Sequence, residues 1–275
     1  MERTRHPVIG FLTDFGLDGA AATCRGVMLG ICRDAQIVDI SHAIAKYAIG
    51  DGSFVLRSAL PFLPVGVHLA VVDPGVGTGR RPIAIRAARG DVLVGPDNGL
   101  LIETAEALGG IVEARELSNR ALWLPVASST FHGRDIFAPA TAHLAAGDAG
   151  FEDVGRAVDP ATLERLERPP TMVSDGRIAA AVIYVDTFGN LRLSAGADAM
   201  GAAFGPIDPG AILRARVGDA DLAVTWAPSF GHVPAGATLL YRDSSGNLAL
   251  ARNQGDLASH LGVASGASVV LSRAD

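Results

Sequence analysis

The sequence predicts an α/β fold class: an N-terminal α/β domain with a mainly parallel central sheet, then a smaller, mostly β C-terminal domain. In the first half, short apolar runs alternate with stretches that carry apolar residues at helical spacing. After residue 176, short strands separated by Gly and Asp turns replace that alternation. Between the two, residues 164–176 combine charge with a Pro-Pro pair, which is typical of a domain boundary. We therefore expect domains at residues 1–168 and 177–275.

The N-terminal elements follow from hydrophobic periodicity and turn residues. Strands are expected at residues 7–13, 36–41 and 66–73, and helices at residues 18–32 and about 50–59. Residues 82–101 predict two strands around a Gly90-Asp91 turn and then a helix that begins near Asn98.

The C-terminal elements are short strands. They are expected within residues 177–186, 211–226, 237–251 and 267–272. One helix is expected between Asn253 as N-cap and Gly262 as C-cap.

Composition narrows the class of protein. The chain has 275 residues, 49% of them hydrophobic, which is enough to bury a substantial core. Its formal net charge of -6 provides no basic field for nucleic acid or an anionic membrane. The N-terminus lacks a secretory apolar region, and other apolar runs are too short to span a membrane. We expect a soluble cytoplasmic protein with neither nucleic-acid nor membrane partners.

The two cysteines, Cys24 and Cys32, fall in one predicted helix. Eight helical residues separate them by roughly 12 Å, too far for a disulfide. Neither has the spacing of a zinc ligand. Both are interpreted as small core residues.

Acidic residues follow four predicted strands. In open α/β sheets, ligands bind outside the carboxyl ends of the strands. Asp14 ends the first strand, Asp39 lies at the end of the second, Asp73 ends the third, and Asp97 follows a later one. Each could cap the next helix or turn, but four together favour a ligand site.

The stretch VVDPGVGTGRR places Asp73 and Arg80 seven residues apart across a glycine-rich turn. It is neither a P-loop, since no Gly-Lys-Ser/Thr follows, nor a dinucleotide fingerprint, since a strand follows. The turn could bring the two side chains together and orient the carboxylate. An exposed ion pair on a surface hairpin is the alternative.

Further polar groups fall at a predicted helix start and in the C-terminal turns. His132 and Asp135 could be two metal ligands, but further ligands at suitable spacing are missing, so no metal site is expected. His143 is interpreted as a packed side chain. The turns around 186–190 and 241–255 carry carboxylate, amide and aromatic groups that suit adenine or a small polar ligand, or ordinary β-turns.

Seven motifs in order cover nearly the whole chain: FLTDFG, IVDISHAI, VVDPGVGTGRR, VGPDNGLL, TFHGRDIFAPATAHLA, DTFGN and SSGNLALARNQG. Together they resemble the adenosine-forming S-adenosylmethionine (SAM) hydrolases, also called SAM hydroxide adenosyltransferases, which are related to fluorinase and chlorinase. The resemblance implies the same two-domain architecture. It also implies hydrolysis of SAM to adenosine and L-methionine by in-line attack of water on the ribose C5′, without a cofactor.

The resemblance also implies site residues. Asp73, Arg80 and His132 match a catalytic triad around the attacking water, and Asp14 matches the carboxylate that binds the ribose diol. Matches to the rest of the substrate pocket are Asp18, Tyr47, Asp186, Phe188, Asn190, Ser244, Ser245, Arg252, Asn253 and Gln254. A homotrimer is implied, with each pocket closed by the C-terminal domain of a neighbouring chain.

The chain departs from the family pattern in several places. The halogenases carry Thr and Ser where this chain has Val76 and Gly133, and they have a long insertion where residues 87–91 form a short connection. Because Val76 and Gly133 offer a halide no side-chain donor, halogenation is disfavoured. LRLS after DTFGN replaces the usual Thr-Asn-Ile ending. The competing hypotheses are a metal-assisted hydrolase and a non-catalytic SAM or adenosine sensor.

Overall fold

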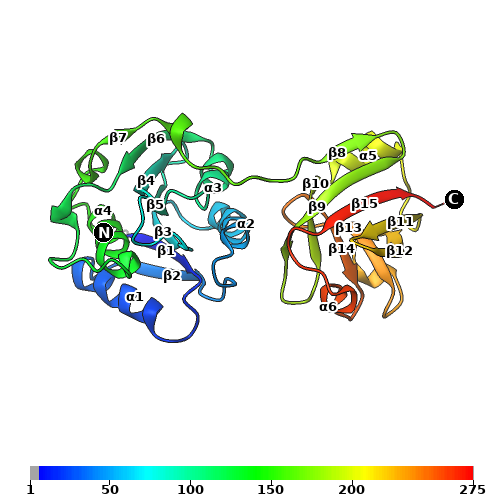
Figure 1. Ribbon diagram of the computed structural model, residues 1–275, viewed down its shortest axis with the longest axis horizontal. Coiled ribbons are helices and arrows are strands. Elements are labelled where there is room, and N and C mark those ends of the chain that lie inside the picture. The colour runs from blue at the N-terminus through cyan, green and yellow to red at the C-terminus, as the bar shows by residue number, and fades with distance from the viewer. Residues whose placement is uncertain (1–5, 275) are drawn as a thin grey trace, which may run out of the picture. The chain divides into compact units, whose positions relative to one another are not determined.

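The structure, a computed structural model, describes residues 6–274. The chain divides into two compact units between Leu166 and Glu167. Figure 1 shows an N-terminal unit of helices around a sheet and a C-terminal unit built mainly of strands. This confirms the predicted α/β N-terminal domain and the mostly β C-terminal domain. Within the described range, no helix combines the length and the apolar character needed to cross a membrane.

The N-terminal unit contains a seven-stranded sheet in the order β2-β1-β3-β5-β4-β6-β7. Its strands are β1 (Val8–Thr13), β2 (Gln36–Ser41), β3 (Val67–Val71), β4 (Pro82–Ala87), β5 (Val92–Pro96), β6 (Ile111–Glu116) and β7 (Ala157–Val158). Strands β2, β1, β3 and β5 run parallel. The carboxyl ends of β1 and β3 therefore lie side by side at one edge, where Asp14 and Asp73 follow.

The sheet is mixed rather than mainly parallel. Strand β4 pairs antiparallel with both β5 and β6, and β6 pairs antiparallel with β7. The physical reason is the short β4–β5 connection, which turns at Gly90 with φ of 104°. A turn of that length can join only antiparallel neighbours, whereas a parallel pair needs a long crossover.

Helices cover both faces of this sheet (Figure 1). Helices α1 (Ala20–Ile31) and α4 (Ala138–Ala146) pack on one face, and α2 (Ile49–Ala59) and α3 (Ile102–Ala107) on the other. Side chains alternate along the strands, so Phe11 enters the first core and Leu12 the second. Cys24 and Cys32 are buried and unbridged in the first core, as predicted.

The C-terminal unit is a β-barrel. Its strands are β8 (Met172–Ser174), β9 (Arg177–Val185), β10 (Leu191–Gly196), β11 (Ile212–Val217), β12 (Ala220–Trp226), β13 (Thr238–Arg242), β14 (Asn247–Arg252) and β15 (Ser268–Arg273). The order is β10-β14-β13-β12-β11-β15-β9-β8, and an added β9–β10 pairing closes the ring. Closure pairs the strand edges and buries one apolar core inside the barrel.

Two helices accompany the barrel, α5 (Asp198–Phe204) and α6 (Leu257–Leu261). The predicted C-cap of α6 is confirmed, since Gly262 is left-handed with φ of 65°. The predicted N-cap is wrong: Asp256, not Asn253, accepts a hydrogen bond from the backbone N–H of Ser259 at 2.8 Å. Asn253 instead donates its side-chain amide to the carbonyl of Val233. Helix α5 was not expected, because Ala197 at its N-cap makes no side-chain capping hydrogen bond and Gly201 lies inside the helix.

Candidate active site

A cavity of about 250 Å³ opens at the carboxyl ends of β1 and β3, and we call it the strand-end cavity. It brings together five residues singled out from the sequence: Asp14, Asp18, Tyr47, Asp73 and His132. It also contains Phe15, Phe131 and Gly133, which sequence reasoning did not assign to the pocket lining. The cavity therefore lies where ligands generally bind in open α/β sheets.

Asp73 and Arg80 meet across the glycine-rich turn. Arg80 donates from Nε to Asp73 Oδ1 at 3.1 Å and from Nη2 to Asp73 Oδ2. Both side chains are more than nine-tenths buried, at 5% exposure for Asp73 and 7% for Arg80. The pair is therefore not an ion pair on a surface hairpin. Two parallel donors fix the rotation of the carboxylate.

The turn itself is held tightly. The Thr78 hydroxyl donates to the carbonyl of Gly75 at 2.7 Å, and the Thr78 backbone N–H donates to the same carbonyl. Gly77 adopts φ of 77°, and a Cβ there would lie 2.5 Å from the carbonyl oxygen of Ser129. Only glycine satisfies both conditions, which explains how the turn packs against the loop that carries His132.

His132 contacts the same guanidinium. Its Nδ1 lies 3.1 Å from Arg80 Nη2. Because an arginine in a protein is always protonated and can only donate, Nδ1 of His132 is the acceptor. Burial, and then the charge of Arg80, lowers the pKa of His132 below its ordinary 6.5. The imidazole is therefore neutral at pH 7 and carries its proton on Nε2.

Asp135 positions the loop before His132. It is fully buried, accepts the backbone N–H of Ser128 at 2.8 Å and pairs with the guanidinium of Arg134. The His132–Phe137 segment continues as a π-helical turn over Gly133–Phe137, which leads into α4. Within residues 6–274, no three His, Cys, Asp or Glu side chains form a cluster that could hold a metal ion.

Asp14 lines the strand-end cavity and contacts a residue with a strained backbone. Its Oδ2 accepts the backbone N–H of Tyr47 at 2.9 Å, and Tyr47 has φ of 69°. Gln254, with φ of 55°, is the other non-glycine residue with positive φ in the described part of the chain. Such backbone costs free energy and concentrates at functional sites. Tyr47 and Gln254 are both among the residues for which the family resemblance implies substrate binding.

Two of the four strand-end acids have structural roles. Asp39 pairs with Arg25 and with His42, whose Nε2 lies 3.1 Å away. Asp97 is buried, accepts from Arg81 Nε at 2.8 Å and accepts the backbone N–H of Glu164 at 2.9 Å. Neither lines the strand-end cavity. Sequence position alone could not separate these acids from Asp14 and Asp73.

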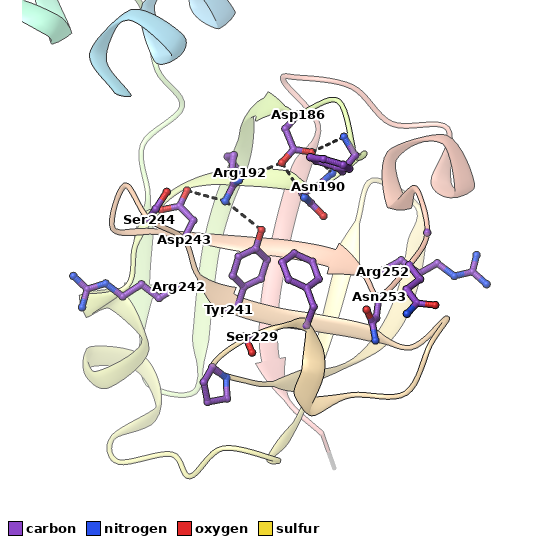
Figure 2. A pocket seen from close by; sticks show the side chains of 15 residues that line it. Asp186, Asn190, Arg192, Ser229, Tyr241, Arg242, Asp243, Ser244, Arg252 and Asn253 are labelled. Atoms are coloured by element: carbon purple, nitrogen blue, oxygen red, sulfur yellow. Dashed lines mark hydrogen bonds and ion pairs between the residues drawn. The ribbon is translucent and has the colours of Figure 1, made fainter. Parts of the chain in front are cut away.

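The barrel carries a separate cavity of about 690 Å³, which we call the barrel cavity (Figure 2). Seven of the residues selected from the C-terminal sequence line it: Asp186, Phe188, Asn190, Ser244, Arg252, Asn253 and Gln254. Ser245 does not line it, and its backbone N–H donates to Asp243 at 2.8 Å. The aromatic side chains of Phe188, Phe230 and Tyr241 give the cavity faces on which a planar base can stack.

Arg192, Tyr241 and Asp243 also line the barrel cavity and were not selected from the sequence. A signal for Asp243 was available. The pattern Asp-x-x-Gly-Asn occurs as DTFGN at 186–190 and again as DSSGN at 243–247. The repeat makes Asp243 the counterpart of Asp186.

Comparison with known proteins places this geometry in a family. Residues 9–155 match the SAM hydroxide adenosyltransferase N-terminal domain, and residues 180–270 match the C-terminal domain of the same family. The chain belongs to the SAM hydroxide adenosyltransferase family. The resemblance inferred from the seven motifs is thereby confirmed.

Relatives within and around the SAM hydroxide adenosyltransferase family align over most of the chain. The (R)-S-adenosyl-L-methionine hydrolase of Salinispora tropica is 45% identical over 262 residues, covering 94% of this chain and 95% of the relative. A fluorinase of an Actinoplanes species is 31% identical and covers 100% of both chains. A crystal structure of an uncharacterized conserved protein from Thermotoga maritima superimposes with a TM-score of 0.89, at 37% identity, covering 96% of this chain and 100% of that one.

The SAM hydroxide adenosyltransferase fold places two of the departures from the halogenase pattern inside the strand-end cavity. Val76 and Gly133 both line it, and neither side chain carries a hydrogen-bond donor. A Cβ at position 133 would lie 2.9 Å from Cζ of Phe15. Position 133 therefore has no room for a side chain unless Phe15 moves.

Proposed function

We propose that this protein hydrolyses S-adenosyl-L-methionine to adenosine and L-methionine by in-line attack of water on the ribose C5′. The observation that carries the proposal is the buried contact of Arg80 with both Asp73 and His132 at the wall of the strand-end cavity. Hydrolase relatives at 45% and 37% identity, both aligned over at least 94% of this chain, support the substrate and the adenosine-forming reaction. The protein is thus assigned as an adenosine-forming SAM hydrolase.

The reaction needs alignment and a stronger nucleophile, and it needs no general acid. The C5′–S bond breaks as the new C5′–O bond forms, and the bonding pair leaves with sulfur as a neutral thioether. Holding water in line with that bond lowers the barrier by several kcal/mol. The water loses one proton, so a fixed acceptor beside it accelerates attack.

The hydrogen bonds assign roles to the three residues. Asp73 is the acceptor that orients the water and takes its proton, since Arg80 holds its carboxylate in place at the cavity wall. His132 is a donor through Nε2–H, because its Nδ1 already accepts from Arg80. Arg80 thereby sets the rotation of Asp73 and the tautomer of His132 together.

The two cavities divide the substrate between them in this proposal. Asp14 binds the ribose diol, and Asp18 and Tyr47 line the nucleoside and methionine part of the pocket. The barrel cavity, with Phe188, Asn190 and the turn at Ser244, receives the adenine and the amino-acid part. We further propose a homotrimer in which neighbouring chains complete one another's sites.

The decisive experiment is incubation of the pure protein with SAM in ¹⁸O-labelled water, with chromatography and mass spectrometry of the products. Adenosine labelled in its 5′-hydroxyl, together with unlabelled methionine, is the expected result. Unlabelled adenosine would contradict direct attack by water. Binding without turnover would identify a sensor, and activity lost on chelation and restored by metal would identify a metal-assisted hydrolase.

A further inference from the structure

Two turns of the barrel are built alike. In DTFGN, Oδ1 of Asp186 accepts the backbone N–H groups of Phe188 and Asn190, each at 3.0 Å. In DSSGN, Oδ1 of Asp243 accepts the corresponding N–H groups of Ser245 and Asn247, each at 2.8 Å. Each turn also has its glycine, Gly189 or Gly246, at positive φ. The strands that follow, β10 and β14, are antiparallel neighbours, so the two turns belong to adjacent strands.

One arginine joins the two turns. Arg192 donates from Nη2 to Oδ2 of Asp186 at 3.2 Å, and its Nη1 lies 3.2 Å from Oδ2 of Asp243 (Figure 2). Nη1 also donates to the hydroxyl of Tyr241 at 3.2 Å. Each aspartate therefore uses Oδ1 to shape its own turn and Oδ2 to bind the shared guanidinium, and Oδ2 of Asp186 also accepts from the side-chain amide of Asn190 at 2.8 Å.

Burial makes this arrangement matter energetically. The Asp243 side chain is 1% exposed, and those of Asp186 and Arg192 are 16% and 18% exposed. Two carboxylates brought this close in a partly buried place repel each other unless a cation lies between them. A planar guanidinium presents separate N–H groups to both, whereas an ammonium is a single point of charge.

We propose that Arg192 is a positioning residue for substrate binding, which bridges the two turns so that they form one side of the barrel cavity. Phe188, exposed to 75%, and Ser244 extend from these turns beside the cavity, and both positions depend on the carboxylates that Arg192 holds. Arg192 stands in LRLS, the segment that departs from the family ending. The inference rests on the proposed function, because it assumes that SAM occupies this cavity.

The test compares Arg192→Lys and Arg192→Met with wild type in SAM turnover. We expect KM to rise about tenfold or more in both, the scale of one lost charge-assisted hydrogen bond, while kcat changes little. The matched control is Arg216→Met. Arg216 also pairs with an aspartate, Asp221 at 3.2 Å, but is 62% exposed and does not line the barrel cavity. Its KM should equal that of wild type.

A second variant separates positioning from a general loss of folding. Arg192→Met leaves the Asp243 charge buried without its cation, so Arg192→Met/Asp243→Asn should have a lower KM than Arg192→Met alone. Equal KM values for these two variants, an unchanged KM in Arg192→Lys, or a loss confined to kcat would each overturn the proposal.

Amide hydrogen exchange tests the bridge without any ligand. In Arg192→Lys, the backbone amides of Phe188, Asn190, Ser245 and Asn247 should exchange faster than in wild type, because their acceptor carboxylates are less firmly held. Unchanged exchange at these amides would overturn the proposed bridge. A wild-type protein that neither binds nor hydrolyses SAM would instead overturn the proposed function, and hydrogen exchange would still decide whether Arg192 holds the turns.

Discussion

Arg80 lies 3.1 Å from Nδ1 of His132 while the same guanidinium holds both carboxylate oxygens of Asp73. One buried cation therefore orients two groups that come from distant parts of the chain. It also decides which imidazole nitrogen carries the proton. With Arg80 held in this way, the cavity wall carries a hydrogen-bond acceptor in Asp73 and a hydrogen-bond donor in Nε2–H of His132.

Replacing Asp73 should stop the chemical step. Asp73→Asn keeps the size of the side chain but removes the proton acceptor, so kcat should fall by about a hundredfold or more. Steady-state chromatography of adenosine measures it, and SAM affinity by calorimetry should stay near wild type. Asp34→Asn, at an exposed acid, is the control. Equal kcat values in wild type and Asp73→Asn would rule out Asp73 as the acceptor.

Turnover should have an acid limb set by His132. Since burial and then Arg80 lower the pKa of His132 below its ordinary 6.5, more than half of the imidazole is neutral at pH 6.5, and the midpoint of the acid limb should lie below that pH. At lower pH, protonation makes Nδ1 a donor that faces Arg80, and kcat should fall. A pH profile of wild type against His132→Gln measures this, and a limb that persists unchanged in His132→Gln would assign it to another group.

The lowered pKa of His132 should also make the stability of the fold depend on pH, which tests the shift independently of turnover. The unfolded chain binds a proton at His132 near pH 6.5, whereas the folded chain does so only at lower pH. The free energy of unfolding should therefore decrease as the pH falls from 6.5 toward the folded pKa. Denaturant titrations at several pH values should show a smaller decrease in His132→Gln than in wild type.

Position 133 should tolerate no side chain. Gly133→Ala places a Cβ 2.9 Å from Cζ of Phe15, so this lining side chain must shift, and the changed cavity wall should raise KM for SAM. Gly26→Ala in α1 is the control, because a Cβ there meets nothing within 4 Å. An unchanged KM in Gly133→Ala would show that Phe15 can move at no cost to binding.

Halide should not replace water in the wild-type protein. Val76 and Gly133 provide no side-chain donor to hold a desolvated anion beside C5′. Incubation with SAM and fluoride or chloride, followed by mass spectrometry, should therefore reveal no 5′-halo-nucleoside. Detection of such a product would mean that backbone groups or bound water suffice to hold the halide.

Asp14 should act mainly on binding. Its proposed bond to the ribose diol exists before and during reaction, so Asp14→Ala should raise KM by about tenfold or more with a smaller effect on kcat. Asp14→Asn retains an oxygen that can accept the Tyr47 N–H, and it separates loss of this backbone contact from loss of charge. If affinity for SAM survives in Asp14→Ala, the ribose binds elsewhere.

Shared sites predict complementation between inactive variants. In a trimer whose sites combine neighbouring chains, an equal mixture of Asp73→Ala and Asn190→Ala chains regains both intact residues at about one site in four. Activity near a quarter of wild type is expected after subunit exchange, and light scattering should report three chains. No recovery after verified exchange would contradict the shared-site proposal.

Local patterns predicted the elements well for physical reasons. Strand β2 (Gln36–Ser41) coincides with its prediction, and α1 and α2 lie within two residues of theirs. Their apolar spacing is a property of a few neighbouring residues, which is enough to select helix or strand. The predicted balance of parallel and antiparallel strands was less accurate, because the antiparallel pairs β4–β6 and β6–β7 join segments that are far apart in the sequence, and only the β4–β5 pair is set by a short local turn. Helix α5 was missed since Ala197 gives no capping signal at its start.

The sequence by itself determined the family, the two-part architecture and the residue types at the strand ends, because ordered motifs and hydrophobic periods are read along the chain. Only the tertiary structure decided which acids act together. Asp39 and Asp97 form ion pairs with arginines away from the strand-end cavity. Asp73 instead shares Arg80 with His132, although Arg80 and His132 are 52 positions apart in the sequence. It also decided that Arg192 bridges Asp186 and Asp243. Such contacts depend on the directions in which side chains leave packed strands and turns, and sequence separation carries no information about those directions.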